Sequence, residues 1–178
     1  MMSAYRVLTR WWTVFALAAS LSLLAAAHAF ERFGGLAPCN LCLKQREVYW
    51  VAVAIALVAS LWALVSRASR GTPRVAAFLL FIVFLTGAIT AGFHAGGEAG
   101  WWELPALCAG GAGDINLERL AALAMGTAEV EPIVACDAVT WRFLGLSMAG
   151  WNTLTAAALA IFSLLAAKRP KDARAPRG

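Results

Sequence analysis

Residues 48–66 read VYWVAVAIALVASLWALVS, and this stretch contains no Asp, Glu, Lys or Arg. A helix rises about 1.5 Å per residue, so about 20 apolar residues cross the roughly 30 Å hydrocarbon layer of a bilayer. Residues 11–30, 75–97 and 143–167 are equally free of these charges. The four stretches predict an all-α membrane protein built as a bundle of four transmembrane helices.

The composition of the whole chain agrees with this prediction. Of its 178 residues, 61% are hydrophobic and 14% are charged, and the mean hydropathy is +0.71. A soluble domain has about 45–50% apolar and about 25% charged residues. The composition therefore argues against a soluble enzyme domain, a disordered chain and a small secreted disulfide scaffold.

The charged residues are divided unevenly between the connections of the four stretches. Ten of the 15 Lys and Arg residues lie before the first stretch, between the second and third, or after the fourth, and nine of the ten acidic residues lie in the other connections. Basic loops are retained in the cytoplasm, so both termini are expected there and the other two connections on the outer side. The net charge of +5 is then a topology signal and does not indicate a nucleic-acid partner.

These observations predict a single membrane domain over residues 1–178. A cleaved signal peptide is an alternative, because Arg6 and Arg10 precede an apolar run that ends in Ala-His-Ala at 27–29, although that run exceeds the usual ~7–15 residues. A short helix over residues 115–125 is expected to lie on the membrane surface. The expected segments are spans at about 11–30, 47–66, 75–95 and 143–167, outer segments at about 31–46 and 96–142, and a basic cytoplasmic tail over 168–178.

All four cysteines, Cys39, Cys42, Cys108 and Cys136, fall in the two outer segments. Disulfides persist in an oxidising compartment, and four cysteines allow three pairings. The spacing favours one of them, because the C-x-x-C of Cys39 and Cys42 can close on itself and leave the other two as a pair. A C-x-x-C closes too short a loop to stabilise a fold much, and its common use is redox exchange. A zinc site and inert thiols are the alternatives.

The residues around the C-x-x-C point to an activated thiol. Pro38 predicts that a helix begins near Cys39 or Cys42, where free N–H groups and the helix dipole stabilise a thiolate. Arg46 lies four residues after Cys42, on the same helix face. Its charge could further stabilise the thiolate or hold a polar oxygen of a ligand, with snorkelling to lipid headgroups as the alternative.

Two more polar residues on the outer side of the membrane are candidates for contact with a ligand near the C-x-x-C. Gln45 could donate to the oxygen that Arg46 holds, or it could be an interfacial polar residue. His94 ends the third stretch, where it could be an interfacial group or contact a ligand or proton near the C-x-x-C. Cys108 is followed by Gly110 and Gly111, and since glycine frees the backbone, this thiol is expected to be mobile and accessible.

Two motifs resemble those of a known family. Residues 38–46, PCNLCLKQR, resemble the C-x-x-C motif of the disulfide bond formation protein B (DsbB) family, and residues 141–148, WRFLGLSM, resemble the segment that leads into that family's fourth helix. The resemblance covers roughly residues 10–167. It implies a four-helix bundle of the bacterial inner membrane that oxidises a periplasmic thioredoxin-fold oxidase, DsbA, and passes the electrons to ubiquinone or menaquinone.

The resemblance also implies a role for each candidate residue. Arg46 matches the family's quinone-site arginine, and His94 falls close to a histidine implicated near the quinone. Gln45 stands at a position that is acidic in some members. The quinone-proximal cysteine pair is matched by Cys39 with Cys42, and the loop pair by Cys108 with Cys136.

Two other functions are kept as alternatives. The vitamin K epoxide reductase family has a similar helix count, a C-x-x-C and a quinone, but its C-x-x-C lies late in the chain, whereas here it follows the first span. A non-catalytic membrane scaffold with structural disulfides or bound zinc is the alternative from another class.

Overall fold

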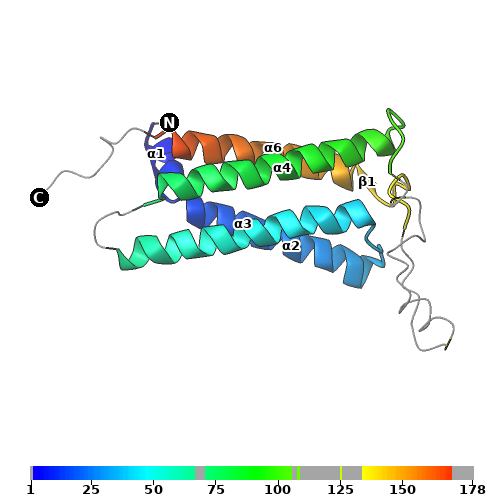
Figure 1. Ribbon diagram of the computed structural model, residues 1–178, viewed down its shortest axis with the longest axis horizontal. Helices are drawn as coiled ribbons and strands as arrows, with labels where there is room; N and C mark the ends of the chain where they lie inside the picture. The colour runs from blue at the N-terminus through cyan, green and yellow to red at the C-terminus, as the bar shows by residue number, and fades with distance from the viewer. Residues whose placement is uncertain (1, 67–70, 106–107, 109–124, 126–133, 170–178) are drawn as a thin grey trace, which may run out of the picture.

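The computed structural model describes residues 2–66, 71–105, 108, 125 and 134–169. Its four long helices run side by side (Figure 1), and each is long and apolar enough to cross a membrane, as predicted. The four are α2 (Trp12–Gly34), α3 (Asn40–Val65), α4 (Arg74–Glu98) and α6 (Met148–Ala167).

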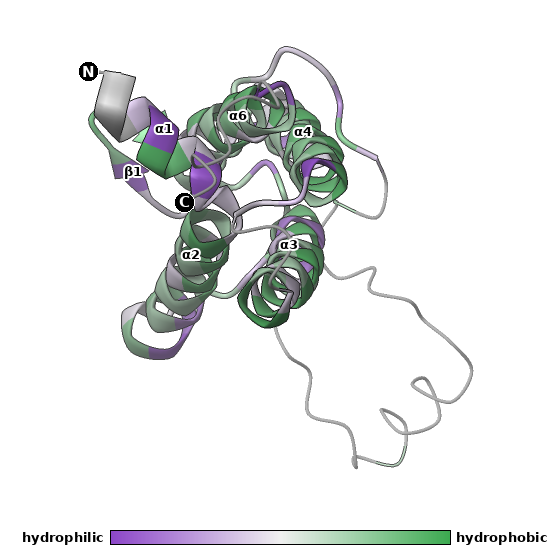
Figure 2. Ribbon diagram, turned by 90° about the vertical axis from the view of Figure 1, so that its left-hand side faces the viewer, coloured by the Kyte–Doolittle hydropathy of each residue, from purple (hydrophilic) through white to green (hydrophobic). Residues whose placement is uncertain are grey.

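The outer surface of the bundle is apolar. Figure 2 shows the four long helices coloured as hydrophobic over most of their length. Large side chains such as Val58, Trp62 and Ile89 are 65–67% exposed. Exposed apolar surface on this scale is unfavourable in water but suits a lipid environment, where a helix satisfies its own backbone polar groups.

The interior of the bundle is built from small residues. Ala52 and Ala56 of α3 and Ala77 and Ala91 of α4 are fully buried. Small residues let helix backbones approach closely in a membrane. Gly87 of α4 shows such a close approach to α3, since a Cβ there would lie 3.0 Å from Cγ1 of Val48.

A short helix, α1 (Met2–Arg10), precedes the first span and was not predicted from the sequence. A bend at Trp11 separates α1 from α2, which begins at Trp12. The indole Nε1 of Trp12 donates to Oγ of Ser163 at 2.8 Å, so the start of α2 is joined to the end of α6. The end of the bundle that carries α1 is opposite the end that carries a hairpin of β1 (Arg142–Phe143) and β2 (Leu146–Ser147) (Figure 1).

The fourth span begins later than residue 143, the start expected from the absence of charge. Residues 142–147 instead form a hairpin of β1 (Arg142–Phe143) and β2 (Leu146–Ser147). The turn residues Leu144 and Gly145 have positive φ, at 50° and 81°, as a tight two-residue hairpin requires. Ser147 then caps α6, because its Oγ accepts the N–H of Gly150 at 3.1 Å.

One other boundary differs from the expected segments. The first span continues past residue 30 to Gly34, where Gly35 ends it in the left-handed conformation with φ 64°. The helix of the second span begins at Asn40, close to the start predicted near Cys39 or Cys42, so residues 40–46 of the expected outer segment are helical. The helix expected over 115–125 lies outside the described residues, apart from Met125.

Candidate active site

The C-x-x-C lies at the start of α3, as predicted. Cys39 is the N-cap, and its Sγ accepts the backbone N–H of Cys42 at 3.2 Å. The two Sγ atoms lie 2.8 Å apart, and the four cysteines are free thiols in this structure. Hydrogen bonding to the Cys42 side chain, with burial, raises the pKa of the Cys39 thiol.

The two loop cysteines pack against this motif. Cys108 and Cys136 are 6% and 1% exposed and form one buried group with Cys39, with Cys42 against it. The N–H of Cys136 donates to the carbonyl oxygen of Cys108 at 2.9 Å. We call these four residues the cysteine cluster; it unites thiols that are far apart in the sequence.

The expectation that Cys108 is accessible is wrong for this arrangement. A thiol behaves as a small apolar group, so Cys108 is buried against the other cysteines despite its glycine-rich surroundings. Burial, with hydrogen bonding to Cys136, raises the pKa of Cys108 to about 12.

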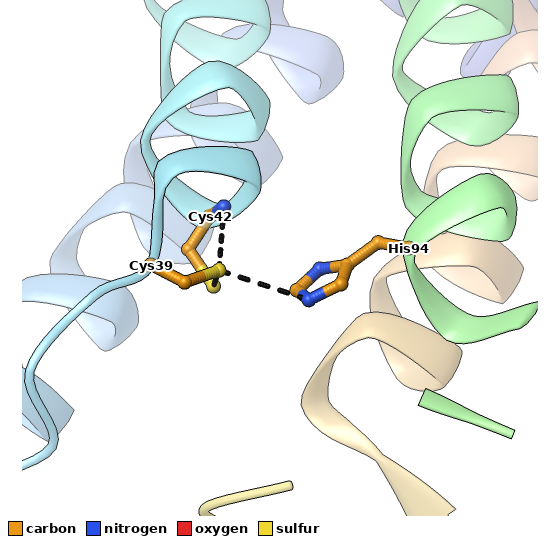
Figure 3. A group of neighbouring side chains, drawn as sticks. All are labelled: Cys39, Cys42 and His94. Atoms are coloured by element: carbon orange, nitrogen blue, oxygen red, sulfur yellow. Dashed lines mark hydrogen bonds between the residues drawn. The ribbon is translucent and has the colours of Figure 1, made fainter. Parts of the chain in front are cut away.

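His94 of α4 lies between the C-x-x-C and the loop pair. Figure 3 shows its ring pointing toward Cys39 and Cys42, and Nε2 lies 3.7 Å from Sγ of Cys39. The same Nε2 lies 2.9 Å from the carbonyl oxygen of Cys136. Because a carbonyl oxygen only accepts hydrogen bonds, Nε2 carries the hydrogen. The imidazole, which is 2% exposed, is therefore a buried link and not an interfacial group.

A chain of hydrogen bonds holds this histidine from behind. Gln45 donates from Nε2 to Nδ1 of His94 at 3.0 Å, and Nδ2 of Asn152 donates to Oε1 of Gln45 at 2.6 Å. The hydroxyl of Tyr49 donates to Oδ1 of Asn152. The chain connects α3, α4 and α6, and with these donors Nδ1 of His94 is an acceptor. The amide of Gln45 is thus bonded to His94 through Nε2 and to Asn152 through Oε1.

Sequence reasoning missed Tyr49 and Asn152, although both carried a signal. Tyr49 lies four residues after Gln45 and therefore on the same face of α3. Asn152 is an amide inside an otherwise apolar span, and polar side chains in spans are costly unless they have a partner or a function.

Arg46 lies one turn after Cys42, as predicted, and is paired with a residue that the sequence did not single out. Its Nη1 donates to Oε2 of Glu31 at 2.5 Å, and its Nη2 donates to the carbonyl oxygen of Ala27 at 3.2 Å. The Arg46 side chain is 16% exposed. The ion pair fixes the guanidinium against the end of α2, beside the C-x-x-C.

Glu98, also not predicted, is a buried carboxylate in this region. Its side chain is 9% exposed, and Oε1 lies 3.7 Å from Nε2 of His94. Among the described residues, Oε2 has no hydrogen-bond partner.

These side chains surround a cavity of about 240 Å³. It lies at the cysteine end of the bundle, between α2, α3, α4, α6 and residues 134–141. Its walls are largely apolar, and a few polar groups converge on it, which is the usual form of a small-molecule site. The apolar lining includes Leu24, Phe30, Trp141 and Met148, and the polar lining includes Cys42, Gln45, Arg46, His94, Glu98 and Asn152.

A metal ion is a second possible occupant of the region. The ligand atoms of Cys39, Cys42 and His94 all lie within 4.8 Å of one another. Thiolate and imidazole ligands suit zinc, which usually takes four ligands in structural sites. Zinc is therefore the alternative occupant, with His94 as a ligand that the sequence did not indicate.

Comparisons with known proteins all point to one family. The family model for disulfide bond formation protein DsbB matches residues 9–166. A disulfide bond formation protein B of Methylococcus capsulatus is 37% identical over 155 residues, which cover 81% of this chain and 85% of the relative. Another of Marinobacter nauticus is 33% identical over 157 residues, covering 84% and 88%. A third, of Azoarcus sp., is 32% identical over 147 residues, covering 80% and 82%.

Proposed function

The chain belongs to the disulfide bond formation protein DsbB family, and from this we propose that it reoxidises a periplasmic dithiol oxidase of the DsbA type and passes the electrons to a membrane quinone. Family membership supports an oxidoreductase role in disulfide formation. It also argues against the alternative of a vitamin K epoxide reductase.

The observation that carries the proposal is the cysteine cluster beside the cavity. A reduced partner thiolate attacks the Cys108–Cys136 disulfide, and the mixed disulfide resolves to release oxidised partner. The loop dithiol then reduces the Cys39–Cys42 disulfide. Thiol–disulfide exchange requires one sulfur to reach another, and the packing of Cys136 and Cys108 against Cys39 supports this internal step.

The first step requires a different arrangement of the loop. Cys108 is 6% exposed, so a partner protein cannot reach it in the cluster. We infer that the present arrangement corresponds to internal exchange, and that Cys108 leaves the cluster to meet the partner.

The lining of the cavity fits a quinone ring. Apolar walls such as Phe30 and Met148 suit the ring, and Arg46 can donate to a ring oxygen. Bound there, ubiquinone or menaquinone would supply a two-electron, two-proton acceptor. Cys42 lines the cavity, so its sulfur is the one we expect to deliver the electrons, with the Arg46 charge stabilising its thiolate.

The proposed location is the bacterial inner membrane. Arg10, Arg74 and Arg169 belong to the end of the bundle opposite the cysteine cluster, and basic ends stay in the cytoplasm. Both termini would then be cytoplasmic, and the four cysteines would face the periplasm, where disulfides persist.

The experiment is anaerobic oxidation of a reduced DsbA-type protein, with quinone reduction followed by absorbance. We expect Arg46→Ala to slow quinone reduction on the order of 100-fold and to leave mixed-disulfide formation with the partner unchanged. Arg32→Ala is the matched control, because Arg32 is exposed on the neighbouring helix. Unchanged quinone kinetics in Arg46→Ala would refute the assignment of this residue.

The scaffold alternative is tested by the zinc content of the purified protein, because the ligand atoms of Cys39, Cys42 and His94 lie close enough together to hold one ion. We expect purified protein to contain no stoichiometric zinc. We also expect Cys136→Ala to trap a mixed disulfide between Cys108 and a thioredoxin-fold protein. Stoichiometric zinc together with no trapped partner would favour the scaffold.

A further inference from the structure

Three arginines from separate elements meet at the end of the bundle opposite the cysteine cluster. Arg10 ends α1, Arg74 begins α4, and Arg169 follows α6. Nη2 of Arg74 donates to the carbonyl oxygen of Arg169. Gly71 lies between the other two, since a Cβ there would be 3.1 Å from Cγ of Arg10 and 3.6 Å from Nη2 of Arg169. We call Arg10, Arg74 and Arg169 the arginine cluster.

The backbone holds this cluster in place. Thr72 donates twice to the carbonyl oxygen of Arg10, from its N–H at 2.8 Å and from its Oγ1 at 3.0 Å. The same Oγ1 accepts the N–H of Thr13 at 3.2 Å, which ties the start of α2 to this point. The three arginines are therefore brought together by contacts between elements, and not only by the basic composition of this end.

The charge of the cluster is not balanced within the described part of the chain. The ion pairs found there involve Glu31, Glu47 and Glu98, all near the cysteine end. Nε of Arg10 is buried without a hydrogen-bond partner among the described residues. Burial and the neighbouring charges of Arg10 and Arg74 lower the pKa of Arg169. Like charges held together beside a buried, unsatisfied donor are unfavourable unless an anion joins them.

We propose that the arginine cluster binds the phosphate of an anionic membrane lipid. Guanidinium groups match phosphate oxygens in paired hydrogen bonds. The cluster lies where spans α2, α4 and α6 begin or end, which is the level of lipid headgroups, and basic pockets between spans on the cytoplasmic side bind anionic headgroups. Asp172, the acidic residue closest in sequence to Arg169, lies outside the described residues. Neutralisation of the arginine cluster by Asp172 is the alternative to lipid binding that the test below includes.

The test is lipid titration of the full-length protein in neutral detergent, followed by melting temperature and by native mass spectrometry. Phosphatidylglycerol should raise the melting temperature and remain bound in the spectrometer, and phosphatidylcholine should not. Arg10→Gln and Arg169→Gln should each weaken phosphatidylglycerol binding on the order of tenfold, the value of one charge-assisted hydrogen bond. Arg32→Gln and Arg142→Gln, at the cysteine end, should leave it unchanged.

Two outcomes would overturn the proposal. Equal protection by glycerol phosphate or inorganic phosphate would make this a soluble-anion site. Binding of phosphatidylglycerol only after Asp172→Asn would show that the cluster is neutralised internally. If a glutamine variant does not fold, Arg10→Lys and Arg169→Lys retain the charge, and the titration of the unaltered protein still decides whether an anionic lipid is preferred. None of these readouts depends on quinone or on a partner oxidase.

Discussion

The Nε2–H of His94 donates to the carbonyl oxygen of Cys136 at 2.9 Å. Through this bond, α4 holds the second loop cysteine against the C-x-x-C at the start of α3. His94 is therefore a positioning residue in this structure, because it orients the chain that carries a reacting sulfur. Its neighbour Cys39, at 3.7 Å, is the sulfur that this arrangement presents to the loop pair.

Replacement of His94 should uncouple the two cysteine pairs. In His94→Ala the carbonyl of Cys136 loses its donor, so we expect internal exchange between the loop dithiol and the C-x-x-C to slow on the order of 100-fold, as misplacement of reacting groups does. The measurement is a single turnover with reduced partner, with the redox state of each pair read by thiol labelling and mass spectrometry. His28→Ala is the control, because the His28 side chain is 57% exposed. A normal exchange rate in His94→Ala would remove the positioning role.

The amide chain behind His94 should contribute to stability. Asn152→Leu keeps the approximate volume and leaves Oε1 of Gln45 and the hydroxyl of Tyr49 without their partner. Each unsatisfied buried group costs roughly 1–3 kcal/mol, so the melting temperature should fall by several degrees. Thr155→Val is the control, because the Thr155 hydroxyl bonds only within its own helix, to Trp151. Equal melting temperatures for both variants would contradict the connected chain.

The raised pKa of Cys108 gives a pH dependence with a defined sign. The shift from 9.0 to about 12 comes from burial and hydrogen bonding to Cys136. In the reduced protein, alkylation of Cys108 should therefore still increase steeply between about pH 10 and 12, whereas the rate for an unfolded control is half-maximal near pH 9 and levels off above about pH 10. The folded state keeps the proton longer than the unfolded chain, so the stability of the reduced protein should fall as pH rises from about 9 toward 12.

The measurement is the rate of iodoacetamide labelling of the Cys108 peptide as a function of pH. At pH 8 a thiol with the raised pKa has roughly one thousandth of the thiolate of an ordinary thiol. If the labelling rate of the folded protein levels off above about pH 10, as for an unfolded thiol, Cys108 is exposed in the reduced state and the buried cluster is not its resting arrangement.

Glu98 should affect quinone reduction more than thiol exchange. The dithiol releases two protons as its S–S bond forms, and the quinone takes up two. Glu98 is suited to carry one of them, because it lines the cavity and its Oε2 has no hydrogen-bond partner among the described residues. Glu98→Gln should slow quinone reduction on the order of 100-fold, within the range for a lost acid–base group, and change the pH profile. Glu47→Gln is the control, with a side chain that is 63% exposed. Equal rates and pH profiles for both variants would exclude this role.

Two neighbouring glycines of α4 should differ in their tolerance of a methyl group. A Cβ at Gly96 would lie 2.1–2.8 Å from the ring of Trp102, whereas one at Gly92 would lie 3.5 Å from Cγ2 of Thr153. Gly96→Ala must displace Trp102, which stacks on Phe93 with ring centroids 5.6 Å apart. We expect it to cost about 1–3 kcal/mol, and Gly92→Ala to be neutral or stabilising by about 0.5–1 kcal/mol. Thermal unfolding in detergent measures both, and the reverse order would contradict the packing.

Much of the site could be predicted because it depends on local features of the chain. Apolar stretches the length of a bilayer identify the four spans, and Pro38 with a C-x-x-C predicts the helix start at Cys39. Arg46 lies one helical turn after Cys42 because helical periodicity alone places it there. The hairpin before α6 also had a local signal, since glycine at the second position of Leu144-Gly145 suits a tight two-residue turn, yet the absence of charge after Arg142 suggested a longer span.

The tertiary structure decided which helix faces meet. Periodicity shows which residues share one face of a helix, but the neighbour of that face follows from packing between helices distant in sequence. For this reason the sequence indicated a polar role for His94 and could not provide its bonds to Gln45 and Cys136. The Arg46–Glu31 ion pair, which joins α3 to α2, likewise depends on which helices pack together and could not be inferred from the sequence. The sequence alone therefore determined the membrane fold and predicted its two sides and its reactive residues, and only the packing of the helices decided that all four cysteines share one buried cluster.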